Sequence, residues 1–407
     1  MPYPPMRLLE ALQVEHDGQP LIVLQDPEGL CEEQVAVSLP FFLVISLMDG
    51  RSEGCDIQRE LMRLTGGQII ALDQIDQIAA EADKVYLLEN ARAVARRAGL
   101  EREFEALAAR PACHAGHSYP DDPEECRAFF SELFQGLPRS DGAAAGRRPR
   151  GLILPHIDLR IGGRAIARGL ASLDPARPPR LYVILGVAHR PTRNLFTLTD
   201  KSFQTPLGLA RTDRRAADRL RELYGAGRLD GAIAHKTEHS VEFAAVALRH
   251  LHGQATDFAI LPILCGSLTD EIEPGGSSPL ARPEVGGFVQ ALRTLFAEYE
   301  GDVCIIASVD LSHVGIKFGE MEGVDDERAQ AVGEADRRML GLVERMDPEG
   351  FFDHFRQDGN ARNVDAVTAV YVLLHTLGGG ACETIVYEQW REQETDSMVS
   401  YASLVIY

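Results

Sequence analysis

The chain has 407 residues, a length typical of two or three domains, and its composition of 45% hydrophobic and 25% charged residues is ordinary for a globular protein. Its formal net charge of −20 argues against nucleic acid as a partner, because broad phosphate binding needs Lys and Arg. No apolar run has the length of a membrane span, and the first residues lack the regions of a signal peptide. The seven cysteines include no Cys-x-x-Cys pair, so we expect free thiols, a cytoplasmic location and no membrane partner.

Residues 1–105 are expected to form a small α+β domain. The expected elements, in chain order, are strands at Leu21–Leu24 and Gln34–Val37, helices at Leu39–Met48, Ile57–Leu64 and Asp73–Ala82, and a strand at Val85–Leu88. This order predicts a winged-helix-like architecture. It resembles the PqqD-like winged-helix modules, which bind peptides beside radical-SAM enzymes, and the resemblance implies an adaptor role. A purely structural module and a DNA-binding winged helix are the alternatives.

Residues 106–407 are expected to form one α/β domain, because apolar strand patterns and amphipathic helix patterns mostly alternate there. A helix over Ala91–Arg110 would connect the two domains, and residues 136–150 have the composition of a flexible surface loop. The expected strands are Leu152–Leu154, Leu181–Val187, Phe196–Leu198, Phe258–Leu264, Val303–Val309, Thr384–Tyr387 and Val399–Ile406. The expected helices are Pro123–Phe134, Ala165–Leu173, Arg214–Leu223, Val241–Leu251, Val285–Tyr299, Asp326–Met346 and Asp365–Leu377.

Histidines and acidic residues stand where several of these strands end or helices begin. They are His156 and Asp158, His189, Glu238 and His239, and Asp310 and His313. If the chain stays extended after Pro155, the side chains of His156 and Asp158 point to the same side. The carboxyl ends of strands in an open α/β sheet are where ligands usually bind. We therefore expect these side chains to share one site.

Imidazole and carboxylate groups are ligands for iron, zinc or manganese, and two histidines with one carboxylate are typical of non-haem iron oxygenases. The groups that do not bind the metal could serve as acid or base. Each residue also has a structural interpretation as a hydrogen-bonded group, and the pair His156 and Asp158 could only cap the helix that follows. A serine-hydrolase interpretation would depend on Ser240 or Ser312 without a supporting motif.

From about Cys113 to Tyr407 the chain resembles the Memo family, specifically the branch called AmmeMemoRadiSam system protein B. The ordered matches are His114-Ala-Gly-His-Ser-Tyr-Pro, Pro155-His, Leu185-Gly-Val-Ala-His, Thr205-Pro-Leu, Glu238-His-Ser-Val-Glu, Leu261-Pro-Ile-Leu-Cys-Gly, Ser308-Val-Asp-Leu-Ser-His and Val399-Ser-Tyr-Ala. The resemblance implies an α/β sheet related to the LigB-type class III extradiol dioxygenases. It further implies a pocket with metal-binding histidines at His156 and His189 and polar neighbours in catalytic positions at His239, Asp310 and His313.

The sequence departs from the family pattern at the third metal ligand. In the family this ligand is a cysteine in a Cys-Gly-x-x-Pro-Ile segment. At the position of that cysteine this chain has Asn363, whose amide is a poor ligand for a soft metal. Ile157 and Asp158 replace the Ala-Gly after the first histidine, so Asp158 could supply the missing anionic ligand. Val187-Ala188 also replaces the Pro-Ser before His189. With nitrogen and oxygen ligands we expect a divalent metal, iron first, with zinc or manganese as alternatives.

Family members have been described both as metal-binding, redox-related proteins and as non-enzymatic phosphopeptide binders. The resemblance therefore implies either a metal-dependent oxidoreductase or a non-catalytic peptide- or protein-binding module with a vestigial metal site. Bacterial members accompany a radical-SAM protein and an AMMECR-like protein, which are the expected partners.

Residues 1–110 should not bind duplex DNA. They carry 10 Lys and Arg against 19 Asp and Glu, and an acidic surface repels phosphates. A gel-shift titration of the full chain with duplex DNA at low salt should therefore show no shift. A shift that weakens as salt rises would instead support the DNA-binding winged helix.

Overall fold

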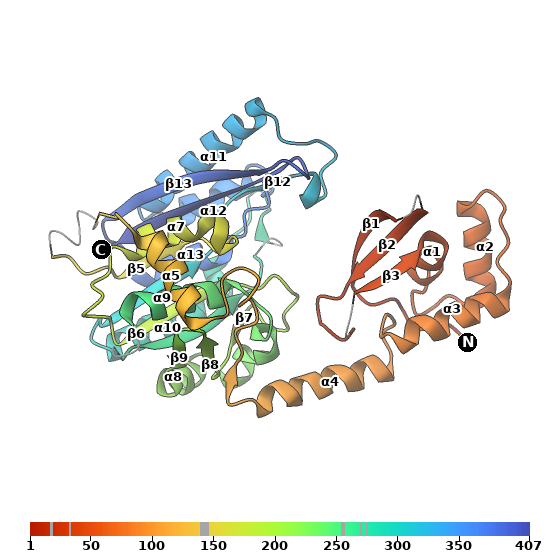
Figure 1. The fold of residues 1–407 in the computed structure, drawn as a ribbon, viewed down its shortest axis with the longest axis horizontal. Coiled ribbons are helices and arrows are strands. Elements are labelled where there is room, and N and C mark those ends of the chain that lie inside the picture. Colours follow the sequence, from red (N-terminus) through yellow and green to blue (C-terminus); the bar gives the residue numbers. More distant parts are fainter. Residues whose placement is uncertain (17–18, 32–33, 139–145, 254–256, 269–270, 274) are drawn as a thin grey trace. The chain divides into compact units, whose positions relative to one another are not determined.

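The structure is a computed structural model that describes residues 1–16, 19–31, 34–138, 146–253, 257–268, 271–273 and 275–407 (Figure 1). The chain forms two compact units, Met1–Ala106 and Leu107–Tyr407. Much of the loop expected at residues 136–150 falls outside the described residues. In the described part of the chain, no helix is both long enough and apolar enough to cross a membrane.

The first unit packs helices against a small antiparallel sheet. Its elements are β1 (Glu10–His16), β2 (Gln19–Gln25), β3 (Val35–Ser38), α1 (Leu39–Ser46), α2 (Gly54–Leu64), α3 (Leu72–Lys84) and α4 (Ala91–Ala106). The strand order is β1-β2-β3, with antiparallel pairing throughout. Ile22 and Leu24 of β2 pack with Ile45 of α1, Ile57 of α2 and Ile75 of α3, so one apolar core joins the sheet to three helices.

Two strand predictions in this unit need correction. The chain has a first strand, β1, that the sequence analysis did not include, because most of its side chains are exposed and it shows no buried face. The strand expected at Val85–Leu88 is wrong. Tyr86 adopts a positive φ of 60°, which breaks an extended run, and only Leu88 pairs, in a single bridge with Met6.

The second unit is built on a large mixed sheet, as the alternating pattern predicted. Its strands are β4 (Ala109–Arg110), β5 (Gly151–Leu154), β6 (Leu181–Val187), β7 (Phe196–Leu198), β8 (Ser202–Thr205), β9 (Gly208–Thr212), β10 (Ala259–Cys265), β11 (Val303–Ser308), β12 (His313–Gly315), β13 (Cys382–Glu392) and β14 (Ser397–Ile406). The order is β12-β14-β5-β11-β6-β10-β9-β8-β4, with β13 on β14 and β7 on β10. The central strands β5, β11, β6, β10 and β9 are parallel, which matches their nearly continuous apolar sequences.

Helices cover both faces of this sheet (Figure 1). One face carries α5 (Pro123–Phe134), α7 (Leu159–Leu170) and α9 (Ser240–His252); the other carries α8 (Arg214–Tyr224), α10 (Pro283–Glu298), α11 (Asp326–Glu344), α12 (Pro348–Arg356) and α13 (Val367–Leu377). Side chains of β6 alternate between the two cores: Tyr182 packs on the α9 side, and Val183 on the α10 side. The result is a three-layer α/β/α unit with two apolar cores.

The first unit depends on a buried ion pair that should make its stability sensitive to acid. The Arg7 guanidinium donates hydrogen bonds to both carboxylate oxygens of Asp26, at 3.0 and 2.6 Å, and to the carbonyl oxygen of Tyr86. Burial alone would raise the pKa of Asp26, but the bonds from Arg7 and from backbone amides outweigh it and lower the pKa to about 2. Because the pKa is lowered on folding, this stabilisation is present above the usual carboxyl range and is lost as pH falls toward 2.

We expect Asp26→Asn to lower the free energy of unfolding of this unit by about 2 kcal/mol at pH 7, with the difference shrinking below pH 4. Hydrogen exchange of peptides from residues 1–106 in the full chain measures this. Glu60→Gln, which removes an exposed pair with Arg63, is the control and should leave stability nearly unchanged, because water screens an exposed ion pair. A pH-independent effect of Asp26→Asn would contradict the expectation.

Candidate metal centre

Three of the predicted site residues meet at the carboxyl ends of adjacent parallel strands. His156 follows β5, Asp310 follows β11 and His189 follows β6, and the sheet order is β5-β11-β6. The ring centroids of His156 and His189 lie 4.9 Å apart. The backbone N–H of His156 donates to Asp310 Oδ1 at 3.0 Å, which joins the ends of β5 and β11. The strand-end positions read from the sequence therefore do converge.

His239 joins them because the start of α9 lies very close to β6. A Cβ on Gly186 would lie 2.5 Å from Ser240 Oγ, so this approach requires glycine. The Ser240 hydroxyl then donates to the carbonyl oxygen of Val187 at 3.0 Å. As a result the His239 ring stacks on His189, with centroids 4.6 Å apart, and lies 5.0 Å from the His156 ring.

Neighbouring groups fix the orientation of two of these imidazoles. His156 Nδ1 donates to the carbonyl oxygen of Ser308 at 2.9 Å, and His189 Nδ1 donates to Glu238 Oε1 at 3.0 Å. Glu238 is buried and also accepts from the backbone N–H groups of His189, His239 and Ser240. When Nδ1 donates in this way, Nε2 keeps its lone pair, and metal-binding histidines are commonly held by this arrangement.

A carboxylate that the sequence analysis did not select lies against both Nε2 atoms. Asp365 precedes α13, and its Oδ1 accepts from the backbone N–H of Asp310 at 2.9 Å. Its Oδ2 lies 3.0 Å from His156 Nε2 and 3.8 Å from His189 Nε2. This oxygen is buried and accepts no hydrogen bond of proper geometry among the described residues. A buried carboxylate oxygen without a donor is unusual and fits a site for a cation.

The candidate ligand atoms form two overlapping groups. His156, His189 and His239 make one, and His156, Asp310 and Asp365 make the other; within each group the ligand atoms lie within 4.8 Å of one another. His156 belongs to both, so its Nε2 is the centre of the cluster.

Asp158 lies outside these groups and takes the structural role that was its alternative. Its side chain accepts from the backbone N–H of Arg160 at 2.9 Å and caps α7. The expectation that it points with His156 assumed an extended chain, whereas the chain bends at Ile157 and enters the helix at Leu159. The sequence contained a signal for Asp365. Glu238 and His239 were selected because they stand at the start of a helix, and Asp365 stands in the same way before α13.

His313 and Asn363 form the rim next to Asp365. His313 Nδ1 lies 3.1 Å from the carbonyl oxygens of Leu311 and Asn363, and the Asn363 amide donates to the carbonyl oxygen of His313 at 3.2 Å. Asn363 adopts a positive φ of 48°, a conformation that Asn tolerates better than most residues. The Asn363 side chain is thus directed to the His313 backbone.

The charges of the site are strongly coupled. Burial opposes the charged form of His156, but the carboxylates of Asp310 and Asp365 outweigh it, so the pKa of His156 is raised. Burial likewise opposes His189, and Asp365 and Glu238 raise its pKa to about 10. Burial raises the pKa of Asp310, whereas the charge on His156 outweighs burial at Asp365 and lowers its pKa. The carboxylates therefore favour positive charge at His156 and His189, whereas burial and the charge on His156 lower the pKa of His239.

The opening motif of the resemblance folds over the start of α9. Glu242 and Arg110 form a fully buried ion pair, and Glu242 also accepts from the Tyr119 hydroxyl and the backbone N–H of His114. The His114 ring lies 5.7 Å from the His239 ring. This part of the chain therefore forms a wall beside the imidazoles.

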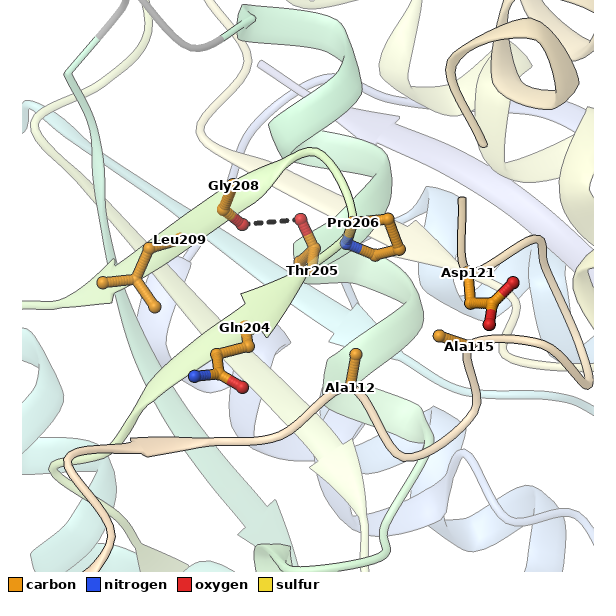
Figure 2. Close-up of a pocket in the computed structure, with 8 residues that line it drawn as sticks. All are labelled: Ala112, Ala115, Asp121, Gln204, Thr205, Pro206, Gly208 and Leu209. Atoms are coloured by element: carbon orange, nitrogen blue, oxygen red, sulfur yellow. Dashed lines mark hydrogen bonds between the residues drawn. The ribbon is translucent and has the colours of Figure 1, made fainter. Parts of the chain in front are cut away.

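A cavity of about 230 Å³ adjoins the site at Asp365. Its wall comprises Val187, Ala188, Cys265, Gly266, Ser267, Asn360, Asn363, Val364, Asp365, Val367 and Thr368. A larger hollow of about 480 Å³ lies between the β8–β9 turn and residues 112–121, where the Thr205 hydroxyl donates to the Gly208 carbonyl and closes the turn (Figure 2). We assign the site to the smaller cavity because its wall includes Asp365, whose carboxylate lies against His156 and His189, whereas the wall of the second hollow includes none of the candidate ligands.

Comparisons with known proteins identify the second unit. The family model described as "Memo-like protein" matches residues 110–405. A MEMO1 family protein of Aquifex aeolicus is 28% identical over 95% of this chain and 96% of its own length, and one of Thermus thermophilus is 28% identical over 88% and 100%. A MEMO1 family protein of Pyrococcus furiosus is 28% identical over 73% of this chain and 98% of its own length.

Substitutions at Asp158 test whether this residue caps α7 or binds a metal. Asp158→Ala removes the cap and should lower the free energy of unfolding by about 1 kcal/mol, whereas Asp158→Asn should be nearly neutral because Asn caps equally well. Urea unfolding followed by the fluorescence of Trp390, the single tryptophan, measures both. Neither variant should change the metal content of the purified protein, and a loss of metal in Asp158→Asn would restore Asp158 as a ligand.

Proposed function

The chain belongs to the Memo family, and we propose that its second unit holds one divalent metal ion at His156, His189 and Asp365. The observation that carries this proposal is the convergence of one buried carboxylate oxygen and two imidazole nitrogens: Asp365 Oδ2 lies 3.0 Å from His156 Nε2 and 3.8 Å from His189 Nε2. The hydrogen bonds at both Nδ1 atoms support it, since they leave Nε2 available to a metal.

The donor set favours a metal of intermediate hardness. Two imidazoles and one carboxylate suit Fe(II), Mn(II) or Zn, and we propose iron first because two histidines with one carboxylate and open positions are typical of non-haem iron sites. Such an ion supplies a Lewis acid for oxygen atoms and, if it is iron, redox chemistry.

The remaining polar groups suit proton transfer. His239 offers a nitrogen within 4.8 Å of those of His156 and His189, and Asp310 Oδ2 lies 3.7 Å from His156 Nε2. His313 lies at the rim beside Asn363. We propose that His239, Asp310 and His313 hold or move protons for a small substrate bound beside Asp365, which lines the 230 Å³ cavity.

The position of Asp365 changes how the family's cysteine segment is aligned with this chain. We propose that Asp365, rather than Asn363, corresponds to the cysteine of the family's Cys-Gly-x-x-Pro-Ile segment. A shift of two residues sets Ala366 against the glycine and Val370 against the isoleucine. The anionic ligand is then replaced by another anion instead of being lost.

The other implications of the resemblance stay predictions. They are the AmmeMemoRadiSam branch, the LigB-type relationship, the radical-SAM and AMMECR-like partners, the cytoplasmic location and the peptide-binding adaptor role of the winged-helix-like first unit. A non-catalytic module with a vestigial metal site is the alternative. The short distances from Asp365 to both imidazoles and the hydrogen bonds that support them favour a working metal centre over that alternative.

Two cysteine substitutions test the ligand assignment. Asp365→Cys should put a thiolate beside both imidazoles and shift the preference toward Cu(I) and Zn, because soft metals favour sulfur. Asn363→Cys is the matched control; its side chain is directed to the His313 backbone, so it should leave the preference unchanged. Competitive metal titrations of both variants and of the wild type measure the order of affinities.

The wild type should bind Fe(II), Mn(II) or Zn in preference to Cu(I), and the His156→Ala/His189→Ala double variant should bind none of them at this site. Tight Cu(I) binding by the wild type, or a shift in Asn363→Cys alone, would contradict the assignment. Wild-type protein that stays metal-free in all titrations would favour the non-catalytic module.

A further inference from the structure

We infer that Asp336 is a positioning residue for the metal centre, because from α11 it holds together the two loops that carry Asp310 and Asp365. The inference rests on the proposed metal site and goes beyond its ligands. None of the hydrogen bonds of Asp336 reaches a candidate metal ligand directly, so its influence passes through residues next to them.

Asp336 is a fully buried carboxylate with three hydroxyl donors. Its Oδ1 accepts from Ser312 at 2.6 Å, and its Oδ2 accepts from Ser400 at 2.5 Å and from Tyr387 at 2.9 Å. Arg362 Nε lies 3.7 Å from Oδ1, and the Arg362 side chain is only 13% exposed. A buried carboxylate is tolerated when donors and a nearby cation satisfy it, and here both are present.

Ser312 connects Asp336 to the first loop. This residue lies between Asp310 and His313, and its N–H donates to Ser400 Oγ at 2.9 Å. The backbones of Leu311, Ser312 and Ser400 exchange two further hydrogen bonds at 2.8 and 2.9 Å. The loop that carries Asp310 is therefore attached to β14 at Ser400, and both hydroxyls at this attachment donate to Asp336.

Arg362 connects Asp336 to the second loop. Its Nε donates to Ser312 Oγ at 3.2 Å, and its carbonyl oxygen accepts from the N–H of His313 at 2.7 Å. Three residues later, Asp365 accepts from the N–H of Asp310. The two loops thus bond to each other at both ends, and the side chains of Ser312 and Arg362 connect them to Asp336.

The physical consequence concerns the Asp365 carboxylate. Its position against His156 depends on the Asp310 N–H, and the Asp310 backbone is fixed two residues away by the Ser312 attachment. Loosening Ser312 should let Asp310 and Asp365 move relative to the imidazoles. Supporting groups of this kind typically contribute 10- to 100-fold to metal affinity.

Two matched hydroxyl deletions separate positioning from general stability. Ser312→Ala and Tyr387→Phe each remove one hydroxyl that donates to Asp336, but only Ser312 lies in a loop of the site. We expect Ser312→Ala to weaken Mn(II) or Zn binding by about 10-fold or more, and Tyr387→Phe to leave it unchanged. Asp336→Asn should weaken it at least as much as Ser312→Ala.

A second control measures the effect of a lost carboxylate elsewhere. Glu349 of α12 accepts from Ser278 and Tyr371 and lies 3.0 Å from His375 Nε2, away from the proposed ligands. Glu349→Gln should lower stability without changing metal affinity. In metal-free protein, hydrogen exchange of peptides that contain residues 310–313 and 360–365 should accelerate in Ser312→Ala and not in Tyr387→Phe.

The outcomes are distinguishable. Weaker metal binding and faster loop exchange confined to Ser312→Ala and Asp336→Asn would support positioning. If the wild type binds metal and these two variants match it, or if Tyr387→Phe and Glu349→Gln weaken binding equally, the inference is overturned and the metal site stands. If the wild type binds no metal at His156 and His189, the proposed function fails and the inference fails with it.

Discussion

The hydrogen bond from the Asp310 backbone to the Asp365 carboxylate is the contact on which the candidate site depends. Asp310 also accepts from the His156 backbone, so this one residue joins the end of β5, the end of β11 and the start of α13. Each bond uses a backbone N–H, whose direction is fixed once the strands have paired. The strand ends and the hydrogen bonds of the loops that follow them therefore set the geometry of the ligands together, which is the arrangement that a preorganised site requires.

Such a concentration of buried charge has a cost, and the fold limits it by pairing every charge locally. Glu238 accepts several N–H bonds, Glu242 pairs with Arg110, and Asp336 accepts three hydroxyls near Arg362. Desolvating an ion costs several kcal/mol unless partners replace the lost water. At Asp365 Oδ2 the neighbours are the two imidazole nitrogens of His156 and His189, at 3.0 and 3.8 Å. A metal cation bound there would satisfy the carboxylate oxygen and both nitrogens together.

The sequence predicted the parts of this site that follow from strand periodicity. His156, His189 and Asp310 stand directly after apolar runs, and the parallel order of those runs brings them together. Asp365 begins the helix expected at Asp365–Leu377, but an Asp at a helix start is ordinarily a cap, so the pattern alone does not mark it as a ligand. Asp158 was misassigned because its direction depends on a bend at Ile157 that the sequence does not encode in a pattern. The strand expected at Val85–Leu88 fails for a similar reason. Its apolar residues indicate burial, but the positive φ of Tyr86 prevents the segment from pairing as a strand.

The described residues that form the candidate site belong to the second unit. His156, His189, His239, Asp310 and Asp365 all lie in residues 107–407. The match to the relative from Pyrococcus furiosus covers 98% of that protein but only 73% of this chain, which is close to the share that the family model covers. The match to the relative from Aquifex aeolicus covers 95% of this chain. Some relatives thus share nearly the whole chain, and others share a stretch about as long as the second unit alone. The acidic first unit has its own apolar core and the buried Arg7–Asp26 ion pair, which stabilise it from within.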